Sequence, residues 1–278
     1  MMVWLENSVF MEMEQNSPNE EFLPIIFRSV IGKELREMSC IMKNTKCADC
    51  GVSEDCPYGA VFERYGSYMN NNSKQRIGAD FIPEVEIINN TTLQFKYRMP
   101  ERNFRFSGAV EAALENAGKS GIGRSRKKYV VSAHESRLHN FDFSGDYIYP
   151  RNIENVEFVS PLRLQSKGRL VLEMTVELFF RAALRRLQFL SPDGKINLQG
   201  LNSFDDELLK LNAEIIAKWM NIDYFSGTQR KLLKMGGLIG HMVFDAQLPP
   251  LLQALLEFME FFHIGKNISF GLGRIRIS

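Results

Sequence analysis

The sequence predicts an α+β protein made of two similar halves, because one structural pattern occurs twice along the chain. In each copy an apolar helical segment is followed by a glycine pair, by closely spaced basic residues and by a strand. The first copy covers residues 104–131 and the second covers residues 248–277. A repeat of this kind indicates a duplicated βαββαβ unit, which is the ferredoxin-like arrangement. We therefore expect two tandem ferredoxin-like domains.

The boundary between the domains is expected near residue 150, where a segment with a glycine, a proline and several aromatic residues separates the halves. The first domain then covers residues 1–150 and carries a small cysteine-rich insertion at residues 40–59. The second domain covers residues 151–278 and carries a glycine-rich loop at residues 265–273.

In the first half, each element follows from the spacing and type of its apolar residues. Residues 2–13 are predicted to form a strand, and residues 20–38 place apolar side chains at the spacing of a helix. Clustered or alternating β-formers predict strands at residues 81–88 and 91–99. A helix is predicted at residues 104–117, where a glycine follows and ends it.

The second half is predicted to follow the same order with additional elements. Its expected elements are a strand at 155–164, helices at 173–190 and 204–219, strands at 221–234 and 238–244, and a helix at 248–262. The helix at 204–219 is inferred from Leu208, Leu211, Ile215 and Trp219, which recur every three or four positions.

Composition and charge limit the classes of function. The chain has 34 basic and 33 acidic residues, so it is not polybasic, and any nucleic-acid surface must come from local clustering. No apolar run approaches the roughly 18 residues of a membrane span. The N-terminal segment carries Glu6, Glu12 and Glu14 where a signal peptide would carry basic residues. We expect a cytoplasmic protein without a membrane partner.

The four cysteines of the chain all lie within one short segment, with the spacing Cys40-x6-Cys47-x2-Cys50-x5-Cys56. A Cys-x2-Cys pair with two further cysteines nearby can bind one tetrahedral Zn²⁺. Such a zinc would be structural, because four thiolates leave no open position for a catalytic water. The alternatives are reduced thiols that have lost their metal, an iron–sulfur cluster and disulfides; a reducing compartment disfavours the disulfides.

The C-terminal glycine-rich segment has a specific pattern. It reads His263-Ile264-Gly265-Lys266 and, after two residues, Ser269-Phe270-Gly271-Leu272-Gly273-Arg274. This pattern resembles the C-terminal signature of the CRISPR repeat-RNA processing endoribonucleases of the RAMP superfamily. Further stretches that agree with this family are Phe27–Cys40 with the cysteine insertion, Cys56–Glu63, Ser160–Leu164 and Gly236–Gly240.

The resemblance implies two tandem ferredoxin-like domains that bind CRISPR repeat RNA and cleave it without a metal. In such enzymes the ribose 2′-hydroxyl attacks the adjacent phosphate, which leaves a 2′,3′-cyclic phosphate and a 5′-hydroxyl. This chemistry needs a base for the 2′-hydroxyl, an acid for the leaving oxygen, and cations or amide groups for the added negative charge.

The candidates for catalysis depart from the commonest family pattern. Many relatives carry a catalytic histidine near the first helix, whereas this chain has no histidine before His134. His263 is the first candidate for general acid or base because it adjoins the glycine loop, and His241 is the second. Arg28 is the third, because a cation can hold the phosphate while orientation does most of the work. The alternative for each histidine is a structural role, since a helix C-terminus also favours histidine.

RNA affinity is expected to come mainly from phosphate contacts, with strong salt dependence. The predicted RNA-binding residues are Lys119, Gly121, Gly123, Arg124, Arg126, Lys128, Arg163, Gly265, Lys266, Ser269, Gly271, Gly273 and Arg274. Two rival functions stay open, namely a non-catalytic RNA-binding RAMP subunit of a CRISPR effector complex and a zinc-bearing protein–protein adaptor. The expected partners are CRISPR repeat RNA, other CRISPR effector subunits and a second copy of the chain in a homodimer.

Overall fold

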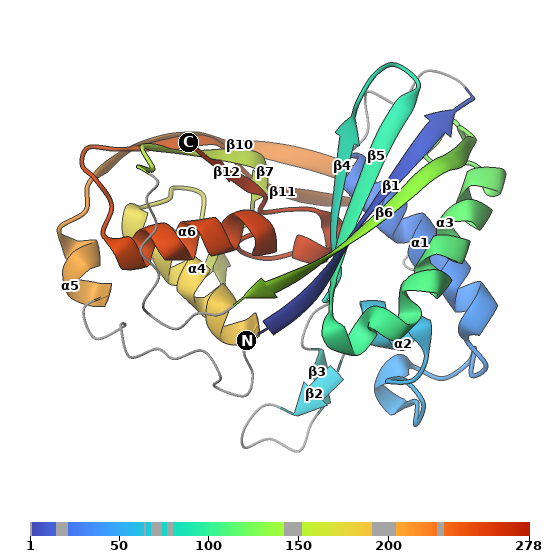
Figure 1. The fold of residues 1–278 in the computed structure, drawn as a ribbon. Helices are drawn as coiled ribbons and strands as arrows, with labels where there is room; N and C mark the ends of the chain where they lie inside the picture. Colours follow the sequence, from blue (N-terminus) through green and yellow to red (C-terminus); the bar gives the residue numbers. More distant parts are fainter. Residues whose placement is uncertain are drawn as a thin grey trace. The chain divides into compact units, whose positions relative to one another are not determined.

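The structure is a computed structural model, and it contains two compact units (Figure 1). The N-terminal unit comprises Val3–Asn140, and the C-terminal unit comprises Phe141–Ser278 together with the first two residues of the chain. The structure describes residues 2–14, 22–63, 65–67, 74–76, 80–141, 152–190, 204–226 and 231–278.

The N-terminal unit has the predicted βαββαβ order. Its main elements are β1 (Met2–Met13), α1 (Leu23–Ser39), β4 (Ile82–Ile87), β5 (Thr92–Pro100), α3 (Ser107–Ser120) and β6 (Tyr129–Phe141). The strands form one sheet in the order β4-β5-β1-β6, and α1 and α3 pack together on one face of it (Figure 1). The two central strands therefore belong to the two β-α-β segments, as in a ferredoxin-like fold.

Large apolar side chains between these helices and the sheet form the core of the N-terminal unit. Phe27, Ile31 and Leu35 of α1 are fully buried, at positions separated by one helical turn. Phe27 stacks on Phe95 of β5 with ring centroids 4.9 Å apart. Proline in the first turn of α1 fits the helix start, because its missing N–H would have no helical partner there.

An insertion between α1 and β4 contains short elements. They are η1 (Cys47–Asp49), α2 (Pro57–Phe62), β2 (Tyr65–Ser67) and β3 (Lys74–Arg76). Outside the insertion, a short helix η2 (Glu101–Phe106) lies between β5 and α3. Val61 and Phe62 of α2 are buried and join the core of the N-terminal unit. The insertion is therefore packed on the ferredoxin-like scaffold through α2.

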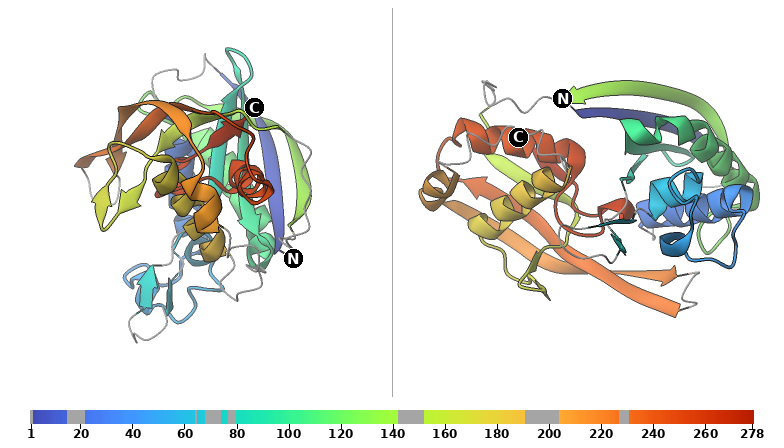
Figure 2. Two further views of the ribbon diagram at one scale, coloured as in Figure 1. Left: turned by 90° about the vertical axis from the view of Figure 1, so that its left-hand side faces the viewer. Right: turned by 90° about the horizontal axis from the view of Figure 1, so that it is seen from below.

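The C-terminal unit repeats the arrangement. Its elements are β7 (Asn155–Leu162), β8 (Gln165–Ser166), β9 (Arg169–Leu170), α4 (Val176–Leu190), α5 (Phe204–Leu209), β10 (Ala213–Ser226), β11 (Lys231–Phe244), α6 (Pro250–Phe262), η4 (Ile268–Phe270) and β12 (Ile275–Ile277). The sheet order is β10-β11-β7-β12, which corresponds strand for strand to the order of the N-terminal sheet. Figure 2 shows α4 and α6 on the same side of this sheet.

The hairpin of β10 and β11 extends beyond the rest of the C-terminal sheet. Its two strands pair from Ala213 with Phe244 to Ser226 with Lys231. Pairing of β11 with β7 covers the shorter stretch from Leu238 to Val243. The part of the hairpin before Leu238 is therefore a two-stranded ribbon.

The duplicated ferredoxin-like fold is confirmed, whereas the helix predicted at residues 204–219 is wrong beyond Leu209. Helix α5 ends at Leu209 and strand β10 begins at Ala213. Residues 215–225 are rich in β-branched and aromatic side chains, and the whole of β10 finds partners on β11. Pairing with the next strand of the hairpin therefore decided the structure of residues 213–219, although their apolar spacing also fits a helix. No helix of the described part of the chain is long and apolar enough to cross a membrane.

Candidate nucleic-acid interface

The glycine loop follows α6 and has a backbone that requires glycine at several positions. Gly265, Gly271 and Gly273 have φ values of 94°, 81° and 76°. A Cβ atom on Gly273 would lie 1.9 Å from the carbonyl oxygen of Ile264, and one on Gly265 would lie 2.5 Å from that of Arg163. Side chains at these positions would therefore force the loop to move.

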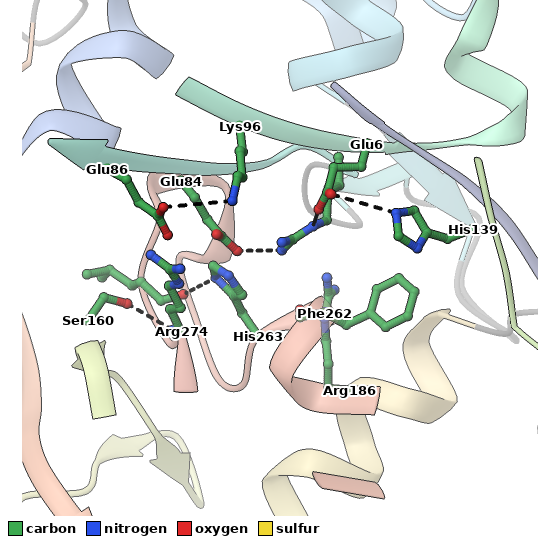
Figure 3. Close-up of polar contacts among 12 residues, drawn as sticks. Glu6, Glu84, Glu86, Lys96, His139, Ser160, Arg186, Phe262, His263 and Arg274 are labelled. Carbon is green, nitrogen blue, oxygen red and sulfur yellow. Dashed lines mark hydrogen bonds and ion pairs between the residues drawn. The ribbon is translucent and has the colours of Figure 1, made fainter. Parts of the chain in front are cut away.

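Hydrogen bonds hold the glycine loop against the end of β7. The amide of Lys266 donates to the carbonyl of Arg163 at 2.8 Å, and that of Gly273 donates to Pro161 at 3.1 Å. The amide of Arg274 donates to the Ser160 hydroxyl at 2.8 Å (Figure 3). These three amides already have partners within the protein, and the side chain of Lys266 is exposed on the loop.

His263 connects the end of α6 to the glycine loop. Its imidazole is fully buried, and Nδ1 lies 3.2 Å from the carbonyl oxygen of Leu272 (Figure 3). Its backbone has φ 56° and ψ 162°, a conformation that is normally restricted to glycine. The buried guanidinium of Arg186 donates to the carbonyl of Phe262, immediately before it, at 3.3 Å. The helix end is thus fixed on both sides of the strained residue.

Arg163 connects the glycine loop to the β10–β11 hairpin. Its guanidinium donates to the carbonyl of Gly236 at 2.7 Å, while its own carbonyl accepts the Lys266 amide. A second connection is the contact between the rings of Tyr224 on β10 and Phe270 on η4, with centroids 5.9 Å apart. Arg163, predicted to bind RNA, therefore has a positioning role within the C-terminal unit.

His241 lies on a different part of the C-terminal unit. It is on β11, directly opposite Glu157 of β7, and its chain neighbour Met242 is buried. Alternation along the strand therefore places His241 on the sheet face away from α4 and α6. Glu157 also accepts a hydrogen bond from Arg276 at 3.1 Å. The structure accordingly places His241 on the open sheet face and His263 at a buried helix end.

The predicted basic corner of the N-terminal unit is a tight turn between α3 and β6. Ile122 and Lys127 form a backbone bridge with N–H···O distances of 2.8 and 2.9 Å. Gly121 has φ 81°, and a Cβ there would lie 2.3 Å from the carbonyl oxygen of Arg126. The exposed cations of this turn and its approach are Lys119, Arg124, Arg126 and Lys128, and Gly123 lies between them with φ 69°. Folding thus gathers four predicted RNA-binding cations around one turn.

Arg28 of α1 packs against the insertion. Its guanidinium lies 5.1 Å from the ring centre of Phe62 in α2, and that of Arg36 lies 5.7 Å from the ring centre of Tyr58. Burial raises the pKa of the Tyr58 hydroxyl, with a further increase from Glu63. These cation–π contacts give both arginines a structural role in seating α2.

The four cysteines are partly exposed free thiols in the insertion. Cys56 precedes α2, and its Sγ lies 3.8 Å from the Ser39 hydroxyl. Burial raises the pKa of the Cys47 thiol, and the nearby Glu63, Cys56 and Cys40 raise it further. Three of the thiols therefore lie in one neighbourhood. Within the described ranges, no group of three or more metal-ligating side chains has a geometry that would hold an ion.

A cluster of charged side chains on the N-terminal sheet was not predicted from the sequence. Arg98 of β5 forms ion pairs with Glu6 of β1 and Glu84 of β4, and His139 Nε2 lies 3.7 Å from Glu6 (Figure 3). Burial lowers the pKa of the His139 imidazole, although Glu6 acts in the opposite direction. Alternation within β5, which puts Lys96 and Arg98 on one face, is the sequence signal for this cluster.

Each half of the chain matches a protein-family model. A family model described as CRISPR-associated endoribonuclease Cas6 matches residues 156–275. A second model, AF_1859_N, described as an N-terminal domain, matches residues 4–157. A search of curated proteins by sequence found no match.

Solved structures with the same fold include several Cas6 proteins. A Cas6 (TTHA0078) product complex is 15% identical with a TM-score of 0.56, and the match covers 100% of both chains. Thermus thermophilus Cas6 (TTHB231) is 11% identical with a TM-score of 0.56 and covers 100% of this chain and 99% of its own. A chain of a partial Cas6-RT-Cas1–Cas2 complex is 11% identical with a TM-score of 0.54, and the match covers 100% of this chain and 46% of that one. At these identities the structural matches show the fold alone. The C-terminal part of the chain, residues 156–275, matches the CRISPR-associated endoribonuclease Cas6 family.

Proposed function

We propose that this protein binds CRISPR repeat RNA in precursor transcripts and cleaves it by attack of a ribose 2′-hydroxyl on the adjacent phosphate. The products would be a 2′,3′-cyclic phosphate and a 5′-hydroxyl, and no metal takes part in the reaction. The observation that carries the proposal is the Cas6 family match over residues 156–275, which includes the whole glycine loop. The rigid geometry of this loop supports it, because pre-arranged groups need little reorganisation when they bind an anion.

Phosphate binding is assigned to two basic surfaces, one in each unit. In the C-terminal unit the exposed Lys266 projects from the glycine loop, with Arg274 at the loop's end. In the N-terminal unit the cations lie around the tight turn at residues 121–127. Each surface can neutralise phosphates without reading sequence, so repeat specificity would come from RNA shape and exposed bases.

The catalytic assignments to His263, His241 and Arg28 stay predictions. Backbone strain at His263 supports the first, because strained residues persist where the surrounding structure holds them and often serve function. The open sheet face supports His241, since RNA can reach a half-buried side chain there. Arg28 would act by holding phosphate charge, in addition to its contact with Phe62.

A non-catalytic RNA-binding subunit is the second candidate function. It is favoured by the burial of His263 and by the absence of histidine from the first 133 residues of the sequence. Such a subunit would use the same basic surfaces and would associate with other CRISPR effector subunits. Cytoplasmic location and a homodimer also stay predictions.

The decisive experiment incubates the purified protein with its CRISPR repeat RNA in the presence of EDTA. A product with a 2′,3′-cyclic phosphate supports the nuclease, whereas a shifted but intact RNA supports the binding subunit. His263→Ala, His241→Ala and Arg28→Ala are compared with the control His134→Ala, which alters a histidine outside the predicted site. Full cleavage by all three variants would remove them from catalysis, and failure of the wild type to bind RNA at low salt would contradict both functions.

The proposal includes one structural Zn²⁺ bound by Cys40, Cys47, Cys50 and Cys56. Support comes from the Cys-x2-Cys spacing and from four free thiols in one insertion. Because the described structure does not group these thiols as metal ligands, the ion would have to draw them together. The ion would hold the loop between α1 and α2 closed and would take no part in RNA cleavage. Metal content is the direct test and is described below.

A further inference from the structure

Trp219 lies on the edge strand β10, directly opposite Leu238, where the two-stranded ribbon begins, and it is partly exposed. Its indole Nε1 donates to the side-chain carbonyl of Asn221 at 2.9 Å, which fixes the orientation of the ring. The ring lies against Gly236 of the neighbouring strand, because a Cβ on Gly236 would be 2.9 Å from Nε1 and 3.1 Å from Cε2. The indole therefore occupies space that any larger residue at position 236 would fill.

Trp219 is not one of the buried core residues, although Leu238 directly opposite it is buried. Its ring rests on the backbone of Gly236. An aromatic ring that is oriented by a hydrogen bond and partly exposed to solvent can stack on a nucleobase. Base–aromatic stacking tolerates every base because each has a π-face.

A continuous set of hydrogen bonds connects this tryptophan to the glycine loop. Gly236, on which the ring lies, accepts the Arg163 guanidinium, and the Arg163 carbonyl accepts the Lys266 amide. The stacking surface and the loop's lysine are therefore held in a fixed relation within one unit.

We propose that Trp219 is a stacking platform for an unpaired base of the RNA whose phosphates contact the glycine loop. The inference rests on the proposed RNA-binding function and adds a base-contacting residue to it. Asn221 and Gly236 are positioning residues, since one holds the indole edge and the other leaves room for the ring.

The two tryptophans of the chain allow a direct test by fluorescence, because Trp4 is 3% exposed and serves as an internal control. The probe is the CRISPR repeat RNA with 2′-O-methyl riboses, which cannot undergo 2′-hydroxyl attack during a titration. Intrinsic fluorescence reports stacking, and anisotropy of a fluorescein-labelled copy of the same RNA reports affinity. Thermal unfolding of each variant checks that it is folded.

Trp219→Ala is expected to weaken RNA binding by roughly 5- to 140-fold, the range for losing one stacked base. Trp219→Phe keeps an aromatic ring that can stack and should therefore lose less affinity for RNA. In the wild type, RNA should quench the fluorescence of Trp219, and this quenching should disappear in Trp219→Phe. Trp4→Phe should retain both the affinity and the quenching. Asn221→Ala removes the hydrogen bond that orients the indole ring. Its affinity for RNA should lie between that of the wild type and that of Trp219→Ala.

The proposal is overturned if Trp219→Ala and Trp219→Phe both bind RNA as tightly as the wild type, or if the quenching remains in Trp219→Phe. Either result leaves the proposed RNA binding intact. A wild-type protein that binds no RNA at low salt would instead overturn the proposed function together with this inference.

Discussion

The Nδ1 atom of His263 lies 3.2 Å from the carbonyl oxygen of Leu272, so the C-terminal end of α6 and the glycine loop contact each other through one buried imidazole. This contact coexists with a backbone conformation at His263 that costs roughly 1–3 kcal/mol in a residue other than glycine. Side-chain contacts of the imidazole must offset that strain.

Replacing His263 separates its backbone strain from its side-chain role. His263→Gly is expected to have a free energy of unfolding roughly 1 kcal/mol higher than His263→Ala, because glycine adopts positive φ without a Cβ penalty. If the imidazole transfers a proton in cleavage, both variants should lose about 100-fold or more in rate. Urea denaturation and single-turnover cleavage measure the two effects. Equal stability of the two variants would contradict the strain, and full activity in both would exclude His263 from proton transfer.

Gly273→Ala should disrupt the glycine loop. The added Cβ would lie 1.9 Å from the carbonyl oxygen of Ile264, and φ at this position is 76°. We expect a loss of at least about 2 kcal/mol of stability together with weaker RNA binding. Gly108→Ala is the matched control, because its Cβ would meet no atom within 4 Å. Equal denaturation midpoints for both variants would show that the loop tolerates a side chain.

Lys266→Ala should reduce the salt dependence of RNA binding. Lys266 is exposed on the glycine loop, and each phosphate neutralised on a single strand contributes a slope of about 0.7 in log K against log salt. The variant is expected to lose about that much slope, measured by anisotropy over a series of salt concentrations. Lys210→Ala, which removes another exposed lysine at the end of α5, should keep the wild-type slope. An unchanged slope in Lys266→Ala would place the phosphate contacts elsewhere.

The cysteine insertion is expected to contain about one zinc per chain in freshly purified protein, since four thiolates complete a tetrahedral site. Cys47→Ser and Cys50→Ser should each lower the zinc content and the thermal unfolding temperature, because metal binding and loop closure are coupled. Ser53→Ala, in the same loop, is the control. Elemental analysis and calorimetry give the two readouts. Absence of any metal in the wild type, with unchanged stability in both cysteine variants, would leave these cysteines as plain thiols.

Stability should fall on the acid side of neutrality because of His139. Burial lowers the pKa of its imidazole in the folded state, so the unfolded chain binds a proton more readily. The favourable contribution of His139 is present above the unfolded value of about 6.5 and is lost as the pH falls below it. Urea denaturation at a series of pH values should show a smaller decrease in His139→Gln than in the wild type. A parallel decrease in both proteins would assign the effect to other groups.

Local sequence patterns were sufficient to predict the duplicated ferredoxin-like arrangement. Helices α1, α3, α4 and α6 follow apolar spacing, and the duplicated glycine corners indicate the repeated unit. The glycine loop could also be predicted from its sequence. Positive φ angles and close backbone contacts favour glycine at specific positions, and these glycines are visible in the sequence. The prediction of a helix at 204–219 was wrong because the conformation of β10 depends on its pairing with β11. The spacing of apolar residues within one segment does not show which strand it will pair with.

By itself, the sequence determined the two ferredoxin-like units, the cysteine segment and the glycine loop, because each can be predicted from the type and spacing of residues that are close in the chain. Only the tertiary structure decided that His263 is buried against Leu272 and that Arg163 donates its hydrogen bond to Gly236, 73 positions away. It also placed the Trp219 ring over Gly236. The physical reason is that strand pairing and side-chain burial join segments far apart in the chain, whereas a sequence motif fixes only what its own residues require.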